Sequence, residues 1–247
     1  MTSPARKTAV IVGVGPGLGL SMARRFGRAG YTPALVSRSG ARHAGYLAAL
    51  AEDGIDAGSF TADVRDQAQV RSALAAIAER YGTIEFLYYG PATVDPAALP
   101  KPITETGPAA VRDAMSWVYP AIEITTQVLP AMIKRGHGGL LFAGGLSAIQ
   151  PMPALGALTV ASAALRNYAL NLSAGLAGTG VYAGTLTIGG LIERGDIHRF
   201  VTSSPGQFGG GVASLDPDEI ADAAWDLYTR RDRAEATFSA LGLVESG

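Results

Sequence analysis

The sequence predicts an α/β protein with a doubly wound, parallel sheet of about seven strands and helices on both faces. Three observations carry this prediction. Short apolar runs alternate with helical patterns along the whole chain, a cluster of glycines follows the first run, and no internal repeat is visible. Hydrophobic residues make up 48% of the 247 positions and charged residues 17%, so one large core can form. We therefore expect a single domain covering residues 1–247.

Strand-like and helix-like segments take turns in the order that βαβ units require. Strands are predicted at residues 8–13, 32–37, 58–64, 84–90, 140–143 and 182–188. Helices are predicted at residues 18–30, 41–53, 66–81, 109–134, 156–176 and 216–231. Residues 189–215 are rich in glycine and show little periodicity, which predicts a mobile lid.

Composition excludes several classes of function. The net charge of −1 with scattered Lys and Arg argues against a nucleic-acid partner, and the absence of cysteine excludes disulfides and thiol chemistry. The three histidines, His43, His137 and His198, are too dispersed for a metal site. No apolar stretch is long enough to span a membrane and no signal peptide is visible, so a cytoplasmic protein is expected.

The first predicted strand runs into a glycine cluster that opens a helix. Gly13, Gly17 and Gly19 have the spacing G-x-x-x-G-x-G. Glycines at such a turn let a pyrophosphate approach the backbone, and the helix N-terminus adds free N–H groups and a positive dipole end. The alternative is a plain turn, but the strand before and the helix after favour a dinucleotide site.

This spacing resembles the short-chain dehydrogenase/reductase family, and the resemblance spans almost the whole chain. Ala62-Asp63-Val64 is similar to the family's Asp-Val pair beside the adenine. Residues 129–132 (Leu-Pro-Ala-Met) and 163–165 (Ala-Ala-Leu) are similar to two of its helix motifs. The resemblance implies a Rossmann-type fold and a homodimer or homotetramer packed through two long helices.

The end of the second strand indicates which cofactor would bind. An acidic residue there would bind the ribose hydroxyls of NAD, but this chain has Ser37-Arg38-Ser39. Arg38 can pair with a 2′-phosphate, which favours NADP(H); a solvated surface Arg is the alternative. The predicted cofactor contacts are Gly13, Gly15, Gly17, Leu18, Gly19, Ser37, Arg38, Ser39, Asp63, Val64, Gly90, Ile188 and Gly189.

The family's chemistry rests on an Asn, a Ser, a Tyr and a Lys, and this chain departs from that pattern. Aligned on residues 163–165, Leu158 stands at the Tyr position and Ser162 at the Lys position. Gly145 stands at the Ser position and Trp117 at the Asn position. Without a positioned acid, reversible reduction of ordinary ketones is not expected.

Four residues are candidates to take over the proton work. Ser147 follows the lost Ser by two positions, although a plain loop serine is the alternative. Arg166 lies one turn past Ser162, so its guanidinium is a candidate for the space of the missing Lys; an Arg that faces solvent or a second subunit is the alternative. Tyr88 and Tyr89 end the fourth strand on opposite faces, so one is expected to line the cleft.

Three functional classes follow. The first is an NADP(H)-dependent oxidoreductase acting on an iminium or an activated double bond, which needs no strong protein acid. The second is an isomerase, cyclase or lyase on the same scaffold, and the third is a non-catalytic NADP(H)-binding protein. Apolar loop residues predict a small hydrophobic substrate: Ile149, Met152, Leu155, Phe200 and Phe208.

Overall fold

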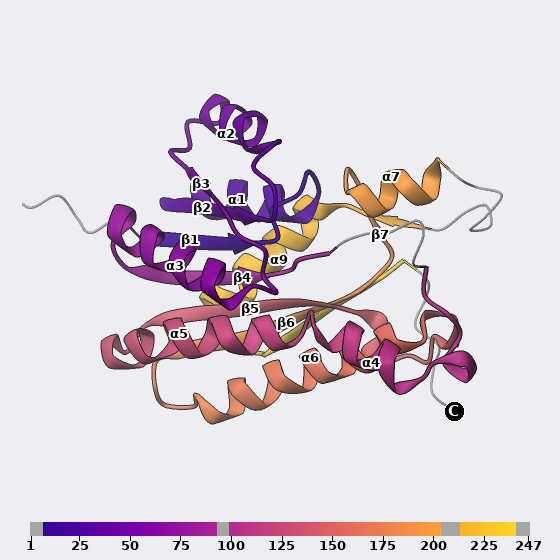
Figure 1. Ribbon diagram of the computed structural model, residues 1–247. Coiled ribbons are helices and arrows are strands. Elements are labelled where there is room, and N and C mark those ends of the chain that lie inside the picture. The colour runs from indigo at the N-terminus through magenta and orange to yellow at the C-terminus, as the bar shows by residue number, and fades with distance from the viewer. Residues whose placement is uncertain (1–6, 93–98, 204–212, 241–247) are drawn as a thin grey trace, which may run out of the picture.

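Seven strands form one parallel sheet in the order β3-β2-β1-β4-β5-β6-β9 in the computed structural model of the chain (Figure 1). The structure describes residues 7–92, 99–203 and 213–240. The strands of this sheet are β1 Lys7–Val12, β2 Tyr31–Ser37, β3 Gly58–Thr61, β4 Ile84–Tyr89, β5 Gly138–Gly145, β6 Val181–Gly189 and β9 Glu235–Ser239. The predicted doubly wound α/β fold is confirmed.

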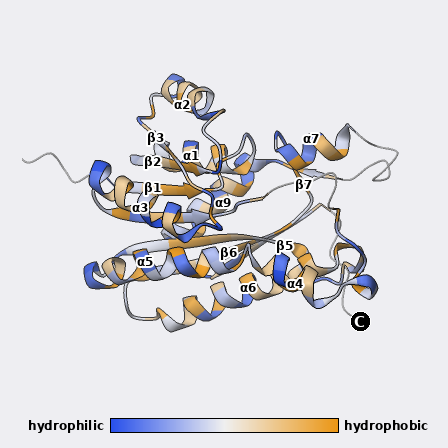
Figure 2. Cartoon of the chain, in the orientation of Figure 1, coloured by the Kyte–Doolittle hydropathy of each residue, from blue (hydrophilic) through white to orange (hydrophobic). Residues whose placement is uncertain are grey.

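Helices cover both faces of the sheet (Figure 1). They are α1 Leu18–Arg28, α2 His43–Glu52, α3 Gln67–Tyr81, α4 Pro108–Met115, α5 Tyr119–Arg135, α6 Ala157–Gly175, α7 Asp196–Thr202 and α9 Pro217–Arg230. Apolar side chains of α3, α5 and α6 pack with one face of the sheet, and those of α1 and α9 pack with the other. Hydropathy follows the same division, because inner strands such as β1 are mostly apolar while the helices mix apolar and polar residues (Figure 2).

Three segments differ from the sequence prediction. The sequence predicts about seven strands but gives ranges for only six, and the seventh is β9. The predicted helix 109–134 is two helices, because the chain turns at residues 116–118 between α4 and α5. Residues 189–215 contain α7 and a two-stranded sheet, β7 Leu191–Ile192 with β8 Ser214–Leu215, rather than irregular chain. Residues 204–212 of the predicted lid, with Phe208, lie outside the described residues.

The strand order reverses between β1 and β4, which is where open α/β sheets bind ligands. The chain leaves both strands at the same edge, and a Cβ on Gly13 would lie 2.5 Å from the backbone N of Pro91. The carboxyl ends of β1, β4, β5 and β6 therefore meet along one edge, where the predicted site residues gather. Within the described residues, no helix is long and apolar enough to cross a membrane.

Candidate functional site

The glycine loop after β1 is built so that side chains would not fit. Gly13 has a positive φ of 93°, a region that favours glycine, and its Cα lies against Pro91. A Cβ on Gly19 would lie 2.8 Å from the carbonyl O of Gly13. These two glycines hold the loop tight between β1 and α1.

The start of α1 carries no acidic group of its own. Gly17 caps the helix without a side-chain hydrogen bond, and the first turn holds no acidic residue. A Cβ on Gly15 would meet nothing within 4 Å, so the loop is open at this point. Unpaired N–H groups at a helix N-terminus, with the positive end of the dipole, suit a pyrophosphate. The loop therefore fits the phosphates of a dinucleotide.

The predicted 2′-phosphate ligands at the end of β2, Ser37, Arg38 and Ser39, differ in whether their polar groups are already bonded. The Ser37 hydroxyl donates to the carbonyl of Ser39 (3.0 Å) and lies 2.7 Å from Nε2 of His43, so it is already engaged. Burial lowers the pKa of His43, which keeps that ring neutral. Arg38 forms no hydrogen bond or ion pair with any described residue, and its charge helps lower the pKa of Asp63. Arg38 is thus the cation left free to meet an anion.

The predicted adenine side of the cleft is a short turn after β3. Oδ1 of Asp63 accepts a hydrogen bond from the backbone N of Arg65 at 3.0 Å, and this bond is the main reason for its lowered pKa. Val64 is buried in the core next to it. The turn is held by these contacts and by a hydrogen bond from the N–H of Ala62 to the carbonyl of Ser37.

At the other end of the cleft, two serine hydroxyls converge on Gly145. A Cβ on Gly145 would lie 3.3 Å from Oγ of Ser162 and 3.4 Å from Oγ of Ser147. Neither hydroxyl has a hydrogen-bond partner among the described residues. The sequence reasoning named Ser147 but counted Ser162 only as a lost lysine. The signal it missed is that both hydroxyls border the space that a side chain at position 145 would take.

The neighbouring side chains carry no acid. Leu158, at the start of α6, is 43% exposed, and Trp117 lies in the turn between α4 and α5. The carbonyl of Trp117 accepts a 2.6 Å hydrogen bond from Tyr89, and its ring lies under the Arg65 guanidinium, 5.0 Å away. In the loop after β5, the buried Oε1 of Gln150 has no hydrogen-bond partner among the described residues. Buried polar atoms are nearly always paired, so this atom is an exception beside the two serines.

The two tyrosines do point to opposite faces, as expected, but neither lines the cleft. Tyr88 and Tyr89 are each 2% exposed and belong to the cores on the two sides of the sheet. Burial raises the pKa of both hydroxyls well above the usual range. The prediction that one of them lines the cofactor cleft is wrong, because β4 ends too deep in the fold.

Arg166 is bound elsewhere. Its Nε and Nη2 donate to the two carboxylate oxygens of Glu235, both at 2.7 Å, and Glu235 also accepts a 2.6 Å bond from Thr187. Glu235 is level with Thr185 on β6, whereas Gly145 is level with Ile188 three residues further on. The carboxylate itself, however, reaches Thr187, which is level with Gly144 beside the site, so the pair lies close to Gly145 along the sheet. The bidentate bond to Glu235 engages the Arg166 guanidinium, which argues against its taking the place of the lysine.

The remaining residues form the floor of the cleft. Gly90 follows β4 and covers the hydroxyl of Tyr88, while Gly189 ends β6 directly above Leu146. Ile188 is half-buried beside Gly145 in the sheet. Arg194 follows β7, and its guanidinium pairs with Asp216 (3.2 Å) and Asp218 (2.7 Å). Among the described residues, no cluster of His, Asp or Glu could hold a metal ion.

A family model described as short chain dehydrogenase matches residues 7–193. The chain belongs to this family. The match ends before Arg194, so α7, β8, α9 and β9 follow it.

Curated relatives and solved structures agree with this assignment. A Streptomyces coelicolor protein assigned as a ketoacyl reductase is 29% identical over 143 residues, 57% of this chain and 54% of that protein, so the match spans about half of its length. An NADP-dependent 3-hydroxy acid dehydrogenase of Salmonella typhi is 25% identical over 89% of this chain and 88% of its own. A Pseudomonas aeruginosa short chain oxidoreductase, solved with NADPH and described as having an atypical catalytic center, has a TM-score of 0.82 at 23% identity, covering 99% and 100% of the two chains.

Proposed function

We propose that this short chain dehydrogenase is an NADP(H)-dependent oxidoreductase whose reaction does not use the family's Tyr, Lys and Ser. The observation that carries the proposal is the pairing of a glycine loop, open at Gly15, with Arg38 at the end of β2, which has no partner among the described residues. An anion-binding loop beside an unpaired guanidinium suits a dinucleotide with a 2′-phosphate. The Salmonella relative and the Pseudomonas structure, both named for NADP or NADPH, support the same cofactor.

The chain's own residues divide the work along the cleft. Gly13, Gly17 and Gly19 shape the loop for the pyrophosphate, and Arg38 meets the 2′-phosphate. The bound cofactor would supply or accept a hydride. Ser147 and Ser162 hydrogen-bond the substrate beside Gly145, where their hydroxyls converge. Their donors orient a polar atom, but the pKa of a serine hydroxyl lies far above neutral pH, so serine alone is a poor general acid.

The missing acid defines the substrate class. With Leu158 at the Tyr position, the favoured acceptor already carries positive charge or takes its proton from water, as an iminium or an activated double bond does. Half-buried apolar residues around the site, Met152, Leu155 and Phe200, suit a small hydrophobic molecule. Ile149 adds an exposed apolar side chain to the same loop.

A direct test follows NADPH at 340 nm against two panels, one of cyclic imines and enones and one of aldehydes and ketones. We expect turnover only on the first panel, with one NADPH consumed per product. Rates of 1–10³ s⁻¹, the ordinary enzyme range, on simple ketones would overturn the assignment of Leu158 and Ser162 to the acid positions.

The exposed Leu158 also favours a second candidate, a redox-silent isomerase, cyclase or lyase, or a non-catalytic binding protein. The same assay separates them from the first. Product without NADPH consumption indicates the redox-silent enzyme, and NADPH binding without any product indicates the binding protein.

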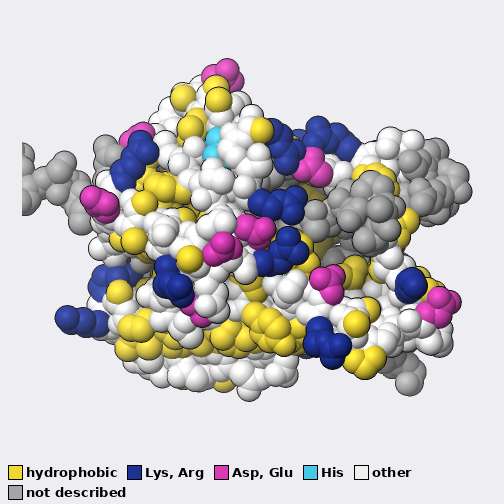
Figure 3. Space-filling model, in the orientation of Figure 1, with side chains coloured by type: hydrophobic (Ala, Val, Ile, Leu, Met, Phe, Trp, Pro, Cys, Tyr) yellow, Lys and Arg dark blue, Asp and Glu magenta, His cyan; other side chains and the backbone are white. Residues whose placement is uncertain are grey.

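We also propose that the chain forms a homodimer or homotetramer through α5 and α6. Apolar side chains follow α5 along the surface (Figure 3), and Tyr119, Ile133 and Val160 are 40% exposed or more. Exposed apolar side chains gathered over two neighbouring helices are typical of an interface. Light scattering during gel filtration measures the state, and a monomer at micromolar concentration would contradict the proposal.

A further inference from the structure

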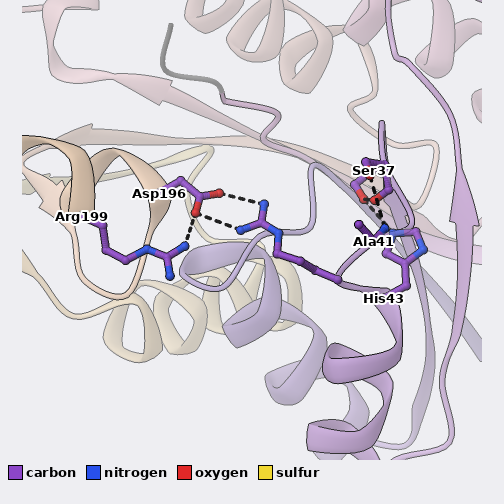
Figure 4. A network of polar contacts seen from close by, with 7 residues as sticks. Ser37, Ala41, His43, Asp196 and Arg199 are labelled. Atoms are coloured by element: carbon purple, nitrogen blue, oxygen red, sulfur yellow. Dashed lines mark hydrogen bonds and ion pairs between the residues drawn. The ribbon is translucent and has the colours of Figure 1, made fainter. Parts of the chain in front are cut away.

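An ion pair joins two parts of the chain that lie on either side of the cofactor cleft. The guanidinium of Arg42, at the start of α2, donates from both terminal nitrogens to the two carboxylate oxygens of Asp196, each at 2.9 Å. The residues are 154 positions apart. Arg199, one turn along α7, donates to the same carboxylate (Figure 4). Two guanidiniums thus converge on one acid.

The Arg42–Asp196 pair lies next to both parts of the predicted phosphate site. Arg42 follows the Ser37-Arg38-Ser39 run by three residues, on the corner of the cleft assigned to the 2′-phosphate. Asp196 is the first residue of α7. Immediately before it, the chain lies on the glycine loop, since a Cβ on Gly17 would be 3.0 Å from the carbonyl O of Glu193 and 3.1 Å from Cα of Gly195.

The segment 193–196 therefore covers the cofactor cleft at two points. One is the glycine loop, where the Glu193 carbonyl lies close to the path of a pyrophosphate. The other is the corner beside Arg38, where Asp196 holds Arg42. A carbonyl oxygen and a carboxylate both repel phosphate groups, so this arrangement disfavours a bound dinucleotide.

The Asp196 carboxylate offers the arginines two anionic oxygen acceptors, as a phosphate group would. Hydrogen bonds from Arg42 lower the pKa of the Asp196 carboxyl, which is therefore ionised at neutral pH. Arginine forks pair with carboxylates and phosphates through the same two parallel hydrogen bonds, and a phosphate monoester carries more charge. The fork of Arg42 that binds Asp196 thus has the geometry to bind a phosphate instead.

We propose that Asp196 is an internal competitor of the 2′-phosphate of NADP(H). In the cofactor-free chain it holds Arg42 and keeps the 193–196 segment on the glycine loop. NADP(H) takes Arg42 over, which releases α7 from α2 and uncovers the loop. The inference rests on the proposed cofactor, and it makes Arg42 a second residue that discriminates NADP(H) from NAD(H).

The test is calorimetric titration of NADPH and NADH into the intact protein and the Asp196→Asn variant, which removes the charge and keeps the shape. We expect the Kd for NADPH to fall about threefold to fivefold, the range set by release of a well-formed exposed ion pair. The Kd for NADH should change less, since NADH has no 2′-phosphate for the freed Arg42. Arg42→Ala should do the reverse for NADPH, raising its Kd while leaving that for NADH unchanged or lower.

Asp222→Asn is the matched control, because it breaks another exposed aspartate–arginine pair, Arg25–Asp222 at 2.7 Å, between α1 and α9. It should leave both Kd values unchanged. If Asp196→Asn behaves like this control, the pair is only a surface contact and the inference fails. If Asp196→Asn weakens both cofactors, the pair clasps a bound dinucleotide and the competitor role is wrong. If the unaltered protein binds neither cofactor, the proposed function fails first.

Discussion

The two ends of the cofactor cleft differ in whether backbone or side-chain groups form them. The phosphate end works mainly through backbone: Gly13 and Gly19 create the close approaches, and the start of α1 offers its N–H groups. The reaction end depends on side chains, and we propose that Leu158 and Gly145 stand there in place of an acid and a hydroxyl. Backbone recognition tolerates few substitutions, while a side-chain site can be rebuilt within an unchanged fold.

The largest effect is expected from a side chain added to the glycine loop. Gly13→Ala places a Cβ 2.5 Å from the backbone N of Pro91 at a positive φ, so neither the loop nor β4 can relax cheaply. We expect a loss of about 3 kcal/mol or more in the free energy of unfolding, with NADPH binding abolished. Thermal unfolding and calorimetry measure both.

Gly15→Ala is the matched control at the same loop, because its Cβ would meet nothing within 4 Å. Its unfolding midpoint should equal that of the unaltered protein, while NADPH binds about tenfold more weakly, since the methyl group enters the path of the pyrophosphate. Unchanged NADPH affinity in Gly15→Ala would show that the phosphates do not pass over this loop.

Arg38 is the side chain on which we expect the phosphate end to depend most. Arg38→Ala removes charge-assisted hydrogen bonds to the 2′-phosphate, worth about 1.5–3 kcal/mol, so NADPH affinity should fall about 10- to 100-fold. Affinity for NADH should stay the same, and so should stability, because Arg38 has no hydrogen-bond or ion-pair partner among the described residues. Equal weakening of both cofactors would mean that Arg38 holds the loop rather than the phosphate.

At the reaction end, the two serines should matter less than the glycines do. Ser147→Ala and Ser162→Ala are each expected to lower kcat/KM about tenfold, the value of one hydrogen bond to a polar substrate atom. A rise in KM alone would indicate binding, and a fall in kcat would indicate a bond made in the transition state. Ser173→Ala, further along α6, should leave both constants unchanged.

Most of the fold could be predicted from the sequence because periodicity and glycine punctuation are local. The strand β9 could not, since Glu235–Ser239 is short, half-buried and identified only by its pairing with β6. The break between α4 and α5 also depends on tertiary contact, because Tyr89 binds the carbonyl of Trp117 in the turn.

The candidate site also has features that local sequence predicts and features that depend on tertiary contacts. Glycine spacing and Arg38 are readable along the chain, whereas the partners of a long side chain are not. Helical spacing put Arg166 on the face of Ser162, but it could not show that Glu235, 69 residues away, binds its guanidinium. Arg42 and Asp196 are even further apart in the sequence, so no local sequence pattern predicts their ion pair.

The smallest effect is expected from that Arg166–Glu235 pair, and it decides whether Arg166 belongs to the reaction end. The Arg166 hydrogen bonds hold the pKa of Glu235 below its ordinary value. A carboxyl with a lowered folded pKa stabilises the fold above its unfolded pKa, about 4.3, and loses that contribution as pH falls through the folded value. Glu235→Gln should therefore lower the free energy of unfolding by about 1 kcal/mol at pH 7, and the difference from the unaltered protein should vanish in acid. Asp232→Asn, in an exposed pair with Arg233, is the control and should change stability little. Turnover and NADPH affinity should be unchanged in Glu235→Gln; a collapse of turnover with stability intact would return Arg166 to the active site.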